Sequence, residues 1–412
     1  MIEIIVKSSC CGCEACIQCC PKHCISMQED NEGFLYPKVD KEACIDCGLC
    51  EKVCPVIHQN ASQEPLSSYI AINPNEEIRQ KSSSGGIFTL LAENIIAEGG
   101  VVFGARFDEN WDVVHAWTDT IEGLALFRGS KYVQSRIGDT YKETKEFLQQ
   151  GRKVLFSGTP CQIAGLKKFL RKEYANLLTV DFICHGVPSP GVWRRYLSEL
   201  RESLRAERGD GKNSVPSSID ELPVITGISF RDKSNGWKKY GFRLRYAAFK
   251  AAQNTVSASA IKEEKELLMP YTENQFMKGF LADIYLRPSC YDCPAKSGKS
   301  GSDITIADAW GIDNFARQYD DDKGACYVLE NTAKASLYMN EMRIRMYAVD
   351  LNNIKQYNPS YISSVHPHNK RARFFRLYNR GKKSMSKILC KVFHVTYWDK
   401  LQWSLRRRLK IQ

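Results

Sequence analysis

The stretch CCGCEACIQCCPKHC, residues 10–24, holds seven cysteines in fifteen positions and decides how the N-terminal part of the chain folds. Its spacing returns 34 residues later, from Cys10 to Cys44, and the proline at its end returns as well. The recurring cysteines are Cys10, Cys13, Cys16 and Cys20 in the first copy and Cys44, Cys47, Cys50 and Cys54 in the second. An internal repeat of this kind predicts two equivalent structural halves.

Both copies read C-x2-C-x2-C-x3-C-P, the bacterial iron–sulfur run. Three thiolates in a tight loop can each reach one iron of a cubane, and the fourth cysteine ligates the other cluster. The expected 4Fe-4S ligand sets are Cys10, Cys13, Cys16 and Cys54 for one cluster and Cys44, Cys47, Cys50 and Cys20 for the second. Zinc is the alternative, but a zinc site needs no reciprocal Cys-Pro. The other thiols, Cys11, Cys19 and Cys24, are interpreted as packing residues.

Length and composition organise the rest of the chain. With 412 residues, 43% of them hydrophobic, we expect two or three domains with sizeable cores. No run approaches about 18 apolar residues, and the start MIEIIVKSS lacks the apolar stretch of a signal peptide, so the expected location is the cytoplasm. Seventeen cysteines in that compartment indicate metal or redox chemistry rather than disulfides.

We divide the chain into a small ferredoxin-type domain and a larger mixed α/β domain, an α+β / α/β fold class overall. The segments are 1–60 for the two-cluster ferredoxin domain, 67–206 and 224–369 for the two parts of the larger domain, 207–223 for an exposed insertion or linker, and 370–412 for a basic amphipathic tail. A ferredoxin domain passes single electrons and does little chemistry itself, so the reaction is expected in the larger domain.

The larger domain begins with a loop that enters a helix. In SSSGGIFTLLAENIIAEGG, residues 82–100, a serine cap precedes an apolar stripe from Ile87 to Ile95, and two glycines end it. The free backbone N–H groups of Ser83, Ser84, Gly85 and Gly86 suit a phosphate, although a simple loop and cap explains them equally well. Lys131, in the segment GSKYVQS (129–135), is a second suggestive position.

Residues 139–184 follow the rhythm of a βαβ unit. The pattern predicts a helix over 139–150, a strand over 153–157, a tight turn and a helix over 162–172. The turn is Ser157-Gly158-Thr159-Pro160, and it places Cys161 in the first helical turn, where the helix dipole favours a thiolate. The next strand ends at Cys184, so two successive strands each deliver a cysteine to the carboxyl edge where open α/β sheets bind ligands.

A hairpin turned at Ser234-Asn235-Gly236 is expected next, followed by a further C-x2-C pair and a short strand that carries Asp303 and Asp308. One hypothesis joins Cys161, Cys184, Cys290 and Cys293 in a third 4Fe-4S cluster. A thiol–disulfide centre and buried structural cysteines are the alternatives, since no spacing rule links distant cysteines. Cys326 and Cys390 have no partners in the sequence.

Several separated motifs over residues 67–375 resemble one family. They are SSSGGIFTLLAENI…VVFGARF, GTPCQIAGLKKFL, CHGVPSP and RPSCYDCPAKSGKSGSDITIADAWG, and they resemble the beta-subunit family of coenzyme F420 hydrogenase and dehydrogenase. The resemblance implies an iron–sulfur flavoprotein with FAD, and it supports the third cluster. It also implies that the flavin lies among Ser83–Gly86, the 129–135 segment, Ser157–Pro160 and the segment from Asp303 to Gly311, with Asp308 as a contact.

The resulting hypothesis is an oxidoreductase in which electrons pass between a redox partner such as a ferredoxin, the clusters, FAD and a small-molecule hydride acceptor or donor. The acceptor is the deazaflavin coenzyme or an unknown organic molecule, and many similar chains look like accessory proteins of surface-polysaccharide pathways. Rival interpretations are a non-catalytic electron-transfer adaptor and a redox sensor that uses Cys161 and Cys184 as thiols. His185 is either a proton donor near the site or a satisfied structural histidine.

The positive charge of the chain is concentrated in its tail. The formal charge is +11, yet residues 370–412 hold fourteen Lys or Arg against one acid, Asp399, so the rest is about neutral and no chain-wide nucleic-acid footprint exists. An apolar stripe recurs at helical intervals in this tail: Ile388, Val392, Val395, Trp398, Leu401, Leu405 and Leu409. The pattern predicts peripheral contact with the inner membrane surface, or else a terminal helix packed on the body.

Overall fold

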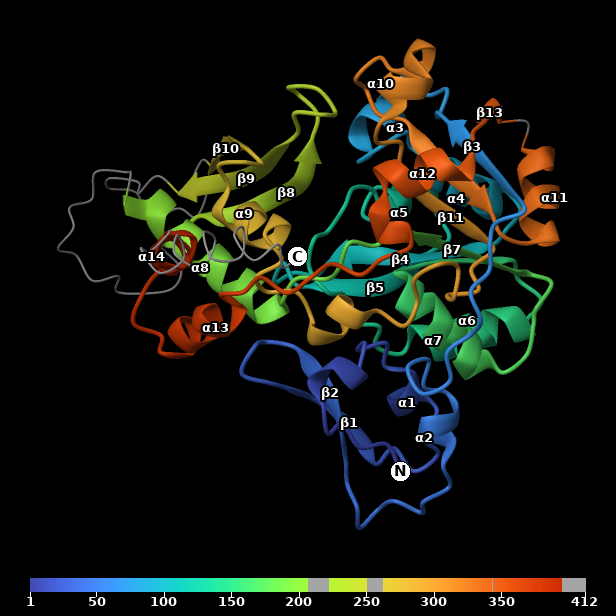
Figure 1. The fold of residues 1–412 in the computed structure, drawn as a ribbon, viewed down its shortest axis with the longest axis horizontal. Helices are drawn as coiled ribbons and strands as arrows, with labels where there is room; N and C mark the ends of the chain where they lie inside the picture. The colour runs from blue at the N-terminus through green and yellow to red at the C-terminus, as the bar shows by residue number, and fades with distance from the viewer. Residues whose placement is uncertain (207–221, 250–261, 343, 395–412) are drawn as a thin grey trace, which may run out of the picture.

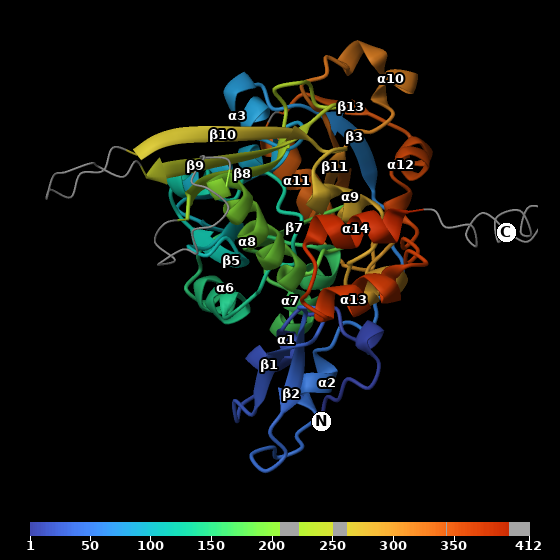
Figure 2. The same cartoon turned by 90° about the vertical axis from the view of Figure 1, so that its left-hand side faces the viewer.

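The computed structural model describes residues 1–206, 222–249, 262–342 and 344–394 (Figure 1). Most of the predicted insertion at 207–223 and the last part of the predicted tail, 395–412, lie outside these residues. The N-terminal domain projects from one end of the larger body in both views (Figures 1 and 2). Within the described residues, no helix is both long and apolar enough to cross a membrane.

The N-terminal domain is built from two short helices and a hairpin. Its elements are η1 Lys7–Ser9, α1 Ala15–Gln18, β1 Ile25–Glu29, β2 Leu35–Val39 and α2 Leu49–Lys52, and β1 pairs antiparallel with β2. The two α-helices occupy equivalent places in the two cysteine runs. Each follows a residue in the left-handed region, Glu14 at φ 60° and Gly48 at φ 71°. The sequence duplication is therefore also a duplication of backbone conformation.

An eight-stranded mixed sheet forms the centre of the body, with the strand order β13-β3-β12-β11-β7-β6-β4-β5. The strands are β3 Ser67–Ala71, β4 Val101–Phe107, β5 Val113–Thr118, β6 Val154–Ser157, β7 Leu177–Phe182, β11 Ile304–Asp308, β12 Cys326–Glu330 and β13 Met346–Ala348. The four central strands, β4, β6, β7 and β11, are mutually parallel, and the outer pairings are antiparallel. This sheet confirms the predicted α/β class and the predicted strand at 153–157.

Helices cover both faces of that sheet. The helices and 3-10 turns of the body are α3 Glu76–Lys81, α4 Ile87–Ala97, α5 Ile121–Leu124, α6 Thr140–Gln149, α7 Pro160–Leu170, α8 Pro190–Ala206, α9 Gln275–Leu281, η3 Pro288–Asp292, α10 Ile312–Phe315, η4 Arg317–Tyr319, α11 Ala333–Glu341, α12 Leu351–Tyr357, η5 Pro359–Tyr361, α13 Arg371–Asn379 and α14 Met385–Phe393. Along β4, Val101 and Phe103 pack toward α6 and α7, whereas Val102 packs toward α4 and α11. This alternation is the period of two expected of a strand buried on both faces.

A second, three-stranded antiparallel sheet packs against α8, α9, α13 and α14 around one aromatic core. Its strands are β8 Val224–Asp232, β9 Gly241–Phe249 and β10 Lys262–Pro270. The predicted hairpin is confirmed as β8 and β9. The tail differs from the membrane prediction in its described part, because Ile388 and Val392 of α14 are fully buried in this core. The part of the apolar stripe that lies on α14 therefore packs on the body, and the part from Val395 onward lies outside the described residues.

Candidate iron–sulfur and cofactor sites

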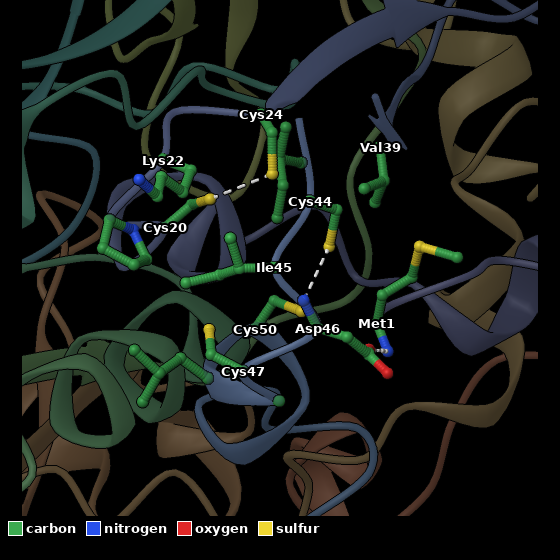
Figure 3. Close-up of a pocket in the computed structure, with 14 residues that line it drawn as sticks. Met1, Cys20, Lys22, Cys24, Val39, Cys44, Ile45, Asp46, Cys47 and Cys50 are labelled. Atoms are coloured by element: carbon green, nitrogen blue, oxygen red, sulfur yellow. Dashed lines mark hydrogen bonds and ion pairs between the residues drawn. The ribbon is translucent and has the colours of Figure 1, made fainter. Parts of the chain in front are cut away.

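The second cysteine run surrounds a cavity at the outer end of the N-terminal domain (Figure 3). Its cysteines are Cys44, Cys47, Cys50 and the reciprocal Cys20, together with Cys24. Backbone N–H groups point at two of the sulfurs: Ile2 donates to Cys50 Sγ at 3.3 Å, and Asp46 donates to Cys44 Sγ at 3.4 Å. Such hydrogen bonds favour thiolate ligands and influence the potential of a cluster. The donor set fits the 4Fe-4S group expected there.

The first cysteine run gathers on the inner side of the domain. Burial raises the pKa of Cys16, and the neighbouring thiols Cys10 and Cys54 raise it further. Cys54 belongs to the second run in sequence and nevertheless lies among thiols of the first, which is the reciprocal arrangement expected. Within the described residues no three His, Cys, Asp or Glu side chains stand close enough to hold a single metal ion.

A third set of cysteines lines one cavity between the N-terminal domain and the body. The residues around it include Cys161, Cys184, Cys290 and Cys293, the four of the third-cluster hypothesis. Cys161 lies in the first turn of α7, Cys184 follows β7, and the other pair lies in and after η3. The parallel pairing of β6 with β7 explains the first two, because the carboxyl ends of both strands meet at the same edge.

One expectation about this cavity needs correction, and one residue makes a contact that the sequence did not indicate. Cys11, interpreted from the sequence as a packing residue, is buried in the core beside α7 and also lines the same cavity as the four cysteines. The pKa of Cys161 is raised rather than lowered, first by hydrogen bonding with Cys11 and then by burial, so the helix dipole does not dominate there. Nothing in the spacing of the head run could have predicted this contact, because it joins residues 150 positions apart.

Helix α7 joins the first and third sites. Gly165 lies one turn after Cys161 on the same face, and a methyl group added there would lie 2.9 Å from both Cβ and Sγ of Cys13. Since a real side chain cannot sit so close, the glycine is what allows the Cys13 loop to approach the helix. Consecutive turns of one rigid helix therefore contact both cysteine sites.

The segments that the resemblance assigned to a flavin meet on the body. Ser130 donates to Ser83 Oγ from its backbone N–H at 2.6 Å and from its hydroxyl at 2.9 Å, which joins the 129–135 segment to the Ser83–Gly86 loop. Gly86, at φ 81°, begins α4 without a side-chain cap. Ser84 and Gly85 bind the backbone of Ala325 and the sulfur of Cys326, so they brace the loop.

The turn Ser157–Pro160 lies next to a histidine that sequence reasoning missed. His115 of β5 contacts Ser157 O through Nε2 at 3.0 Å, and burial lowers the pKa of His115 to about 4. Its Nδ1 atom is buried and has no hydrogen-bond partner among the described residues. Burial also lowers the pKa of Lys131 to about 7, although part of the residue remains exposed. Thr159 caps α7 in a reciprocal pair with Gln162.

Asp308, a predicted flavin contact, is already engaged by the β8–β9 hairpin. Arg231 donates to one carboxylate oxygen at 2.9 Å, and Trp237 Nε1 donates to the other at 3.2 Å. Arg231 also donates to the hydroxyl of Tyr132 at 3.3 Å, so this guanidinium links Asp308 to the 129–135 segment. Its visible role is to anchor the hairpin to the end of β11.

His185 has a carboxylate partner. Its Nε2 lies 2.7 Å from Asp283 Oδ1, and the imidazole remains about one third exposed. It directly follows Cys184 of the third cavity. A histidine paired with a carboxylate and open to solvent can hold and release a proton, so both of the earlier interpretations remain compatible with the geometry.

Two known families match separate parts of the chain. Residues 9–57 match the family described as 4Fe-4S dicluster domain, and residues 151–214 match the family described as the C terminus of the coenzyme F420 hydrogenase/dehydrogenase beta subunit. The fold and the cysteine runs thus define an iron–sulfur protein with a ferredoxin-type domain. Within that class, residues 151–214 are similar to the C terminus of the coenzyme F420 hydrogenase/dehydrogenase beta subunit.

Individual relatives match one part of the chain or the other. An F420H2 dehydrogenase subunit from Methanosarcina mazei is 24% identical over 194 residues, 44% of this chain and 55% of that protein. A 7Fe ferredoxin of Hydrogenibacillus schlegelii is 38% identical over 74 residues, 17% of this chain and 88% of the ferredoxin. The coenzyme F420-dependent sulfite reductase of Methanocaldococcus jannaschii is 29% identical over 178 residues, 40% of this chain and 26% of that enzyme. The chain spans about half of the dehydrogenase protein and about a quarter of the reductase.

Proposed function

We propose that the protein is an iron–sulfur flavoprotein oxidoreductase that passes electrons between three 4Fe-4S clusters, FAD and a hydride-accepting substrate. The observation that carries this proposal is the third cavity, where four cysteines from three separate segments gather beside the ferredoxin-type domain. Kinship with F420-dependent oxidoreductases supports the redox class. The proposed acceptor is the deazaflavin coenzyme or another organic molecule, such as one used in surface-polysaccharide metabolism.

In this proposal the cysteines define an ordered path. The outer site contains Cys47, an exposed cysteine, and would meet a one-electron partner protein such as a ferredoxin. The first-run site comes next, since Cys13 packs on α7, and the third cavity begins one turn earlier on that helix at Cys161. A path through these thiols enters the body at the edge where β6 and β7 end.

FAD, when bound, would supply the exchange between single electrons and a hydride. The residues that would hold it are the Ser83–Gly86 loop, Lys131 and the turn Ser157–Pro160. His115 supports this location, because its Nε2 donates to the Ser157 carbonyl and the buried Nδ1 of the neutral ring is left as an acceptor with no described partner. The pair of His185 and Asp283 would hold the proton that accompanies two electrons in forming a hydride.

The test is anaerobic purification with iron, sulfide and flavin quantified per chain. About twelve irons and one FAD are expected, with bleaching of the flavin by reduced deazaflavin coenzyme. Cys161→Ala should remove about four irons, whereas the control Cys390→Ala, at an exposed cysteine of α14, should remove none. About eight irons and no flavin in the unmodified protein would refute the proposal.

The second candidate is a non-catalytic electron-transfer adaptor. It is favoured by the relative that is named as one part of a larger dehydrogenase, since this chain spans about half of that relative. In that case the iron content would be unchanged, but flavin would be absent and no small acceptor would be reduced without a partner protein.

A further inference from the structure

Arg287 lies fully buried between the N-terminal domain and the body. It directly precedes η3, which carries Cys290 of the third cavity, and its side chain extends in the other direction toward the first cysteine run. Its backbone N–H donates to Val187 O at 3.0 Å, and its carbonyl accepts from the N–H of Cys290 at 2.9 Å. The main chain of Arg287 therefore belongs to the third cavity, whereas its guanidinium belongs to the site of the first cysteine run.

Four hydrogen bonds hold the guanidinium, and two of them go to Cys10. Nε donates to Cys10 O at 2.7 Å, and one terminal nitrogen donates to Cys10 Sγ at 3.4 Å. The same nitrogen donates to Leu35 O at 2.9 Å, and the other donates to Gln134 Oε1 at 2.9 Å. The carbon of the guanidinium lies 4.4 Å from the centre of the Tyr36 ring. Every contact is to a neutral group or to the sulfur.

The surrounding chain is shaped to admit this side chain. Gly12, between Cys10 and Cys13, has a φ of 70°, and a methyl group there would lie 2.8 Å from a terminal nitrogen of Arg287. The same methyl group would lie 2.6 Å from Gln134 Nε2. Only glycine satisfies both the left-handed backbone and the close approach.

The positive charge has no carboxylate within ion-pair distance among the described residues. Glu14 lies within electrostatic reach, but its two oxygens already accept the backbone N–H groups of Ile137 and Gly138 at 3.1 and 3.0 Å, so it offsets the charge only from a distance. A buried cation without a close counter-charge is costly. A cluster with thiolate ligands is net negative and gains a further negative charge when it is reduced. It would supply the missing counter-charge at Cys10.

We propose that Arg287 is a positioning residue that raises the reduction potential of the cluster held by Cys10, making this cluster the electron-accepting step between the outer site and the third site. The sign follows from charge: a fixed cation and an N–H···S hydrogen bond stabilise the more negative, reduced form. The inference rests on the ligand set of the proposed function.

The test compares three variants of the full chain by redox titration followed with electron paramagnetic resonance. Arg287→Met removes the charge and the hydrogen bonds, and Arg287→Lys keeps the charge. The matched control is Arg371→Met, because Arg371 spans the same interface but pairs with the carboxylate of Glu32 at 3.0 Å.

For Arg287→Met we expect the midpoint potential of one cluster to fall by at least 59 mV. For a one-electron couple this shift is a tenfold decrease in the ratio of reduced to oxidised cluster at a given potential. Arg287→Lys should shift it less, and Arg371→Met should leave all midpoints unchanged. The inference would be overturned if Arg287→Met kept its full iron content and all its midpoint potentials. It would also be overturned if Arg371→Met shifted a midpoint potential by the same amount.

A measurement on the unmodified protein covers the case in which Arg287→Met loses its clusters. With arginine labelled by 15N in the guanidinium, pulsed paramagnetic resonance should detect coupling of one reduced cluster to that nitrogen. Absence of any coupling would overturn the inference. Failure of the proposed function is seen separately, as eight irons or missing flavin in the unmodified protein, and leaves this readout intact.

Discussion

The buried pair of Arg231 and Asp308 allows a prediction whose size can be worked out from the geometry. The guanidinium lies 2.9 Å from the carboxylate, with side-chain exposures of 3% and 21%. Removing one partner of such a pair costs about 3–5 kcal/mol, because the other charge stays buried without compensation. Arg231→Met leaves Asp308 its bond from Trp237 Nε1 and some solvent, so we expect about 3 kcal/mol. Asp308→Asn strands the more deeply buried cation, and we expect about 4–5 kcal/mol.

The assay is denaturant unfolding of the holoprotein followed by tryptophan fluorescence. Trp237 and Trp310 stack beside the pair with ring centres 4.7 Å apart, so their emission should report the loss of this region. The control is Arg245→Met, since Arg245 lies 3.5 Å from Glu266 and is 56% exposed. An exposed pair contributes less than about 1 kcal/mol.

Two results would refute this reasoning. One is a destabilisation by Arg231→Met no larger than that of Arg245→Met. The other is a loss of flavin in Asp308→Asn without loss of stability, which would mean that Asp308 contacts the cofactor directly rather than through the hairpin. If the structural role is right, flavin per folded chain stays the same.

Three further outcomes are expected. Gly165→Ala should destabilise the protein by up to about 2 kcal/mol, since overpacking against Cys13 costs about 1–3 kcal/mol and helix propensity returns about 1 kcal/mol. A variant with a larger free energy of unfolding than the parent protein would contradict the close approach of Cys13 to α7. His115 stays neutral when folded down to a pKa of about 4, so its stabilisation is complete above pH 6.5 and is lost, up to about 3 kcal/mol, as the pH falls toward 4. His115→Gln should flatten the unfolding free energy over that range, and an unchanged pH profile would count against burial as the cause. Cys11→Ala should leave about twelve irons, and a loss of four would show Cys11 to be a ligand of the third site.

The sequence by itself determined the parts of this protein that depend on local spacing. Three thiolates of each head cluster come from one short loop, so the two cysteine runs and their duplication could be identified from the sequence. The structure added that the residues before α1 and α2 share the left-handed backbone conformation. Periodicity likewise located β6, α7 and the β8–β9 hairpin within a few residues, because burial of one face imposes it.

Only the tertiary structure decided which distant segments meet. Cys11 at the third cavity, His115 beside Ser157, Asp308 bound to Arg231, and the burial of Ile388 are contacts between elements far apart in the chain. Arg287 is the clearest case, because in the sequence it is one of 58 basic residues, and only the fold buries it against Cys10. Packing between elements is set by complementary surfaces rather than by spacing along the chain, and for that reason no local sequence pattern predicts these contacts.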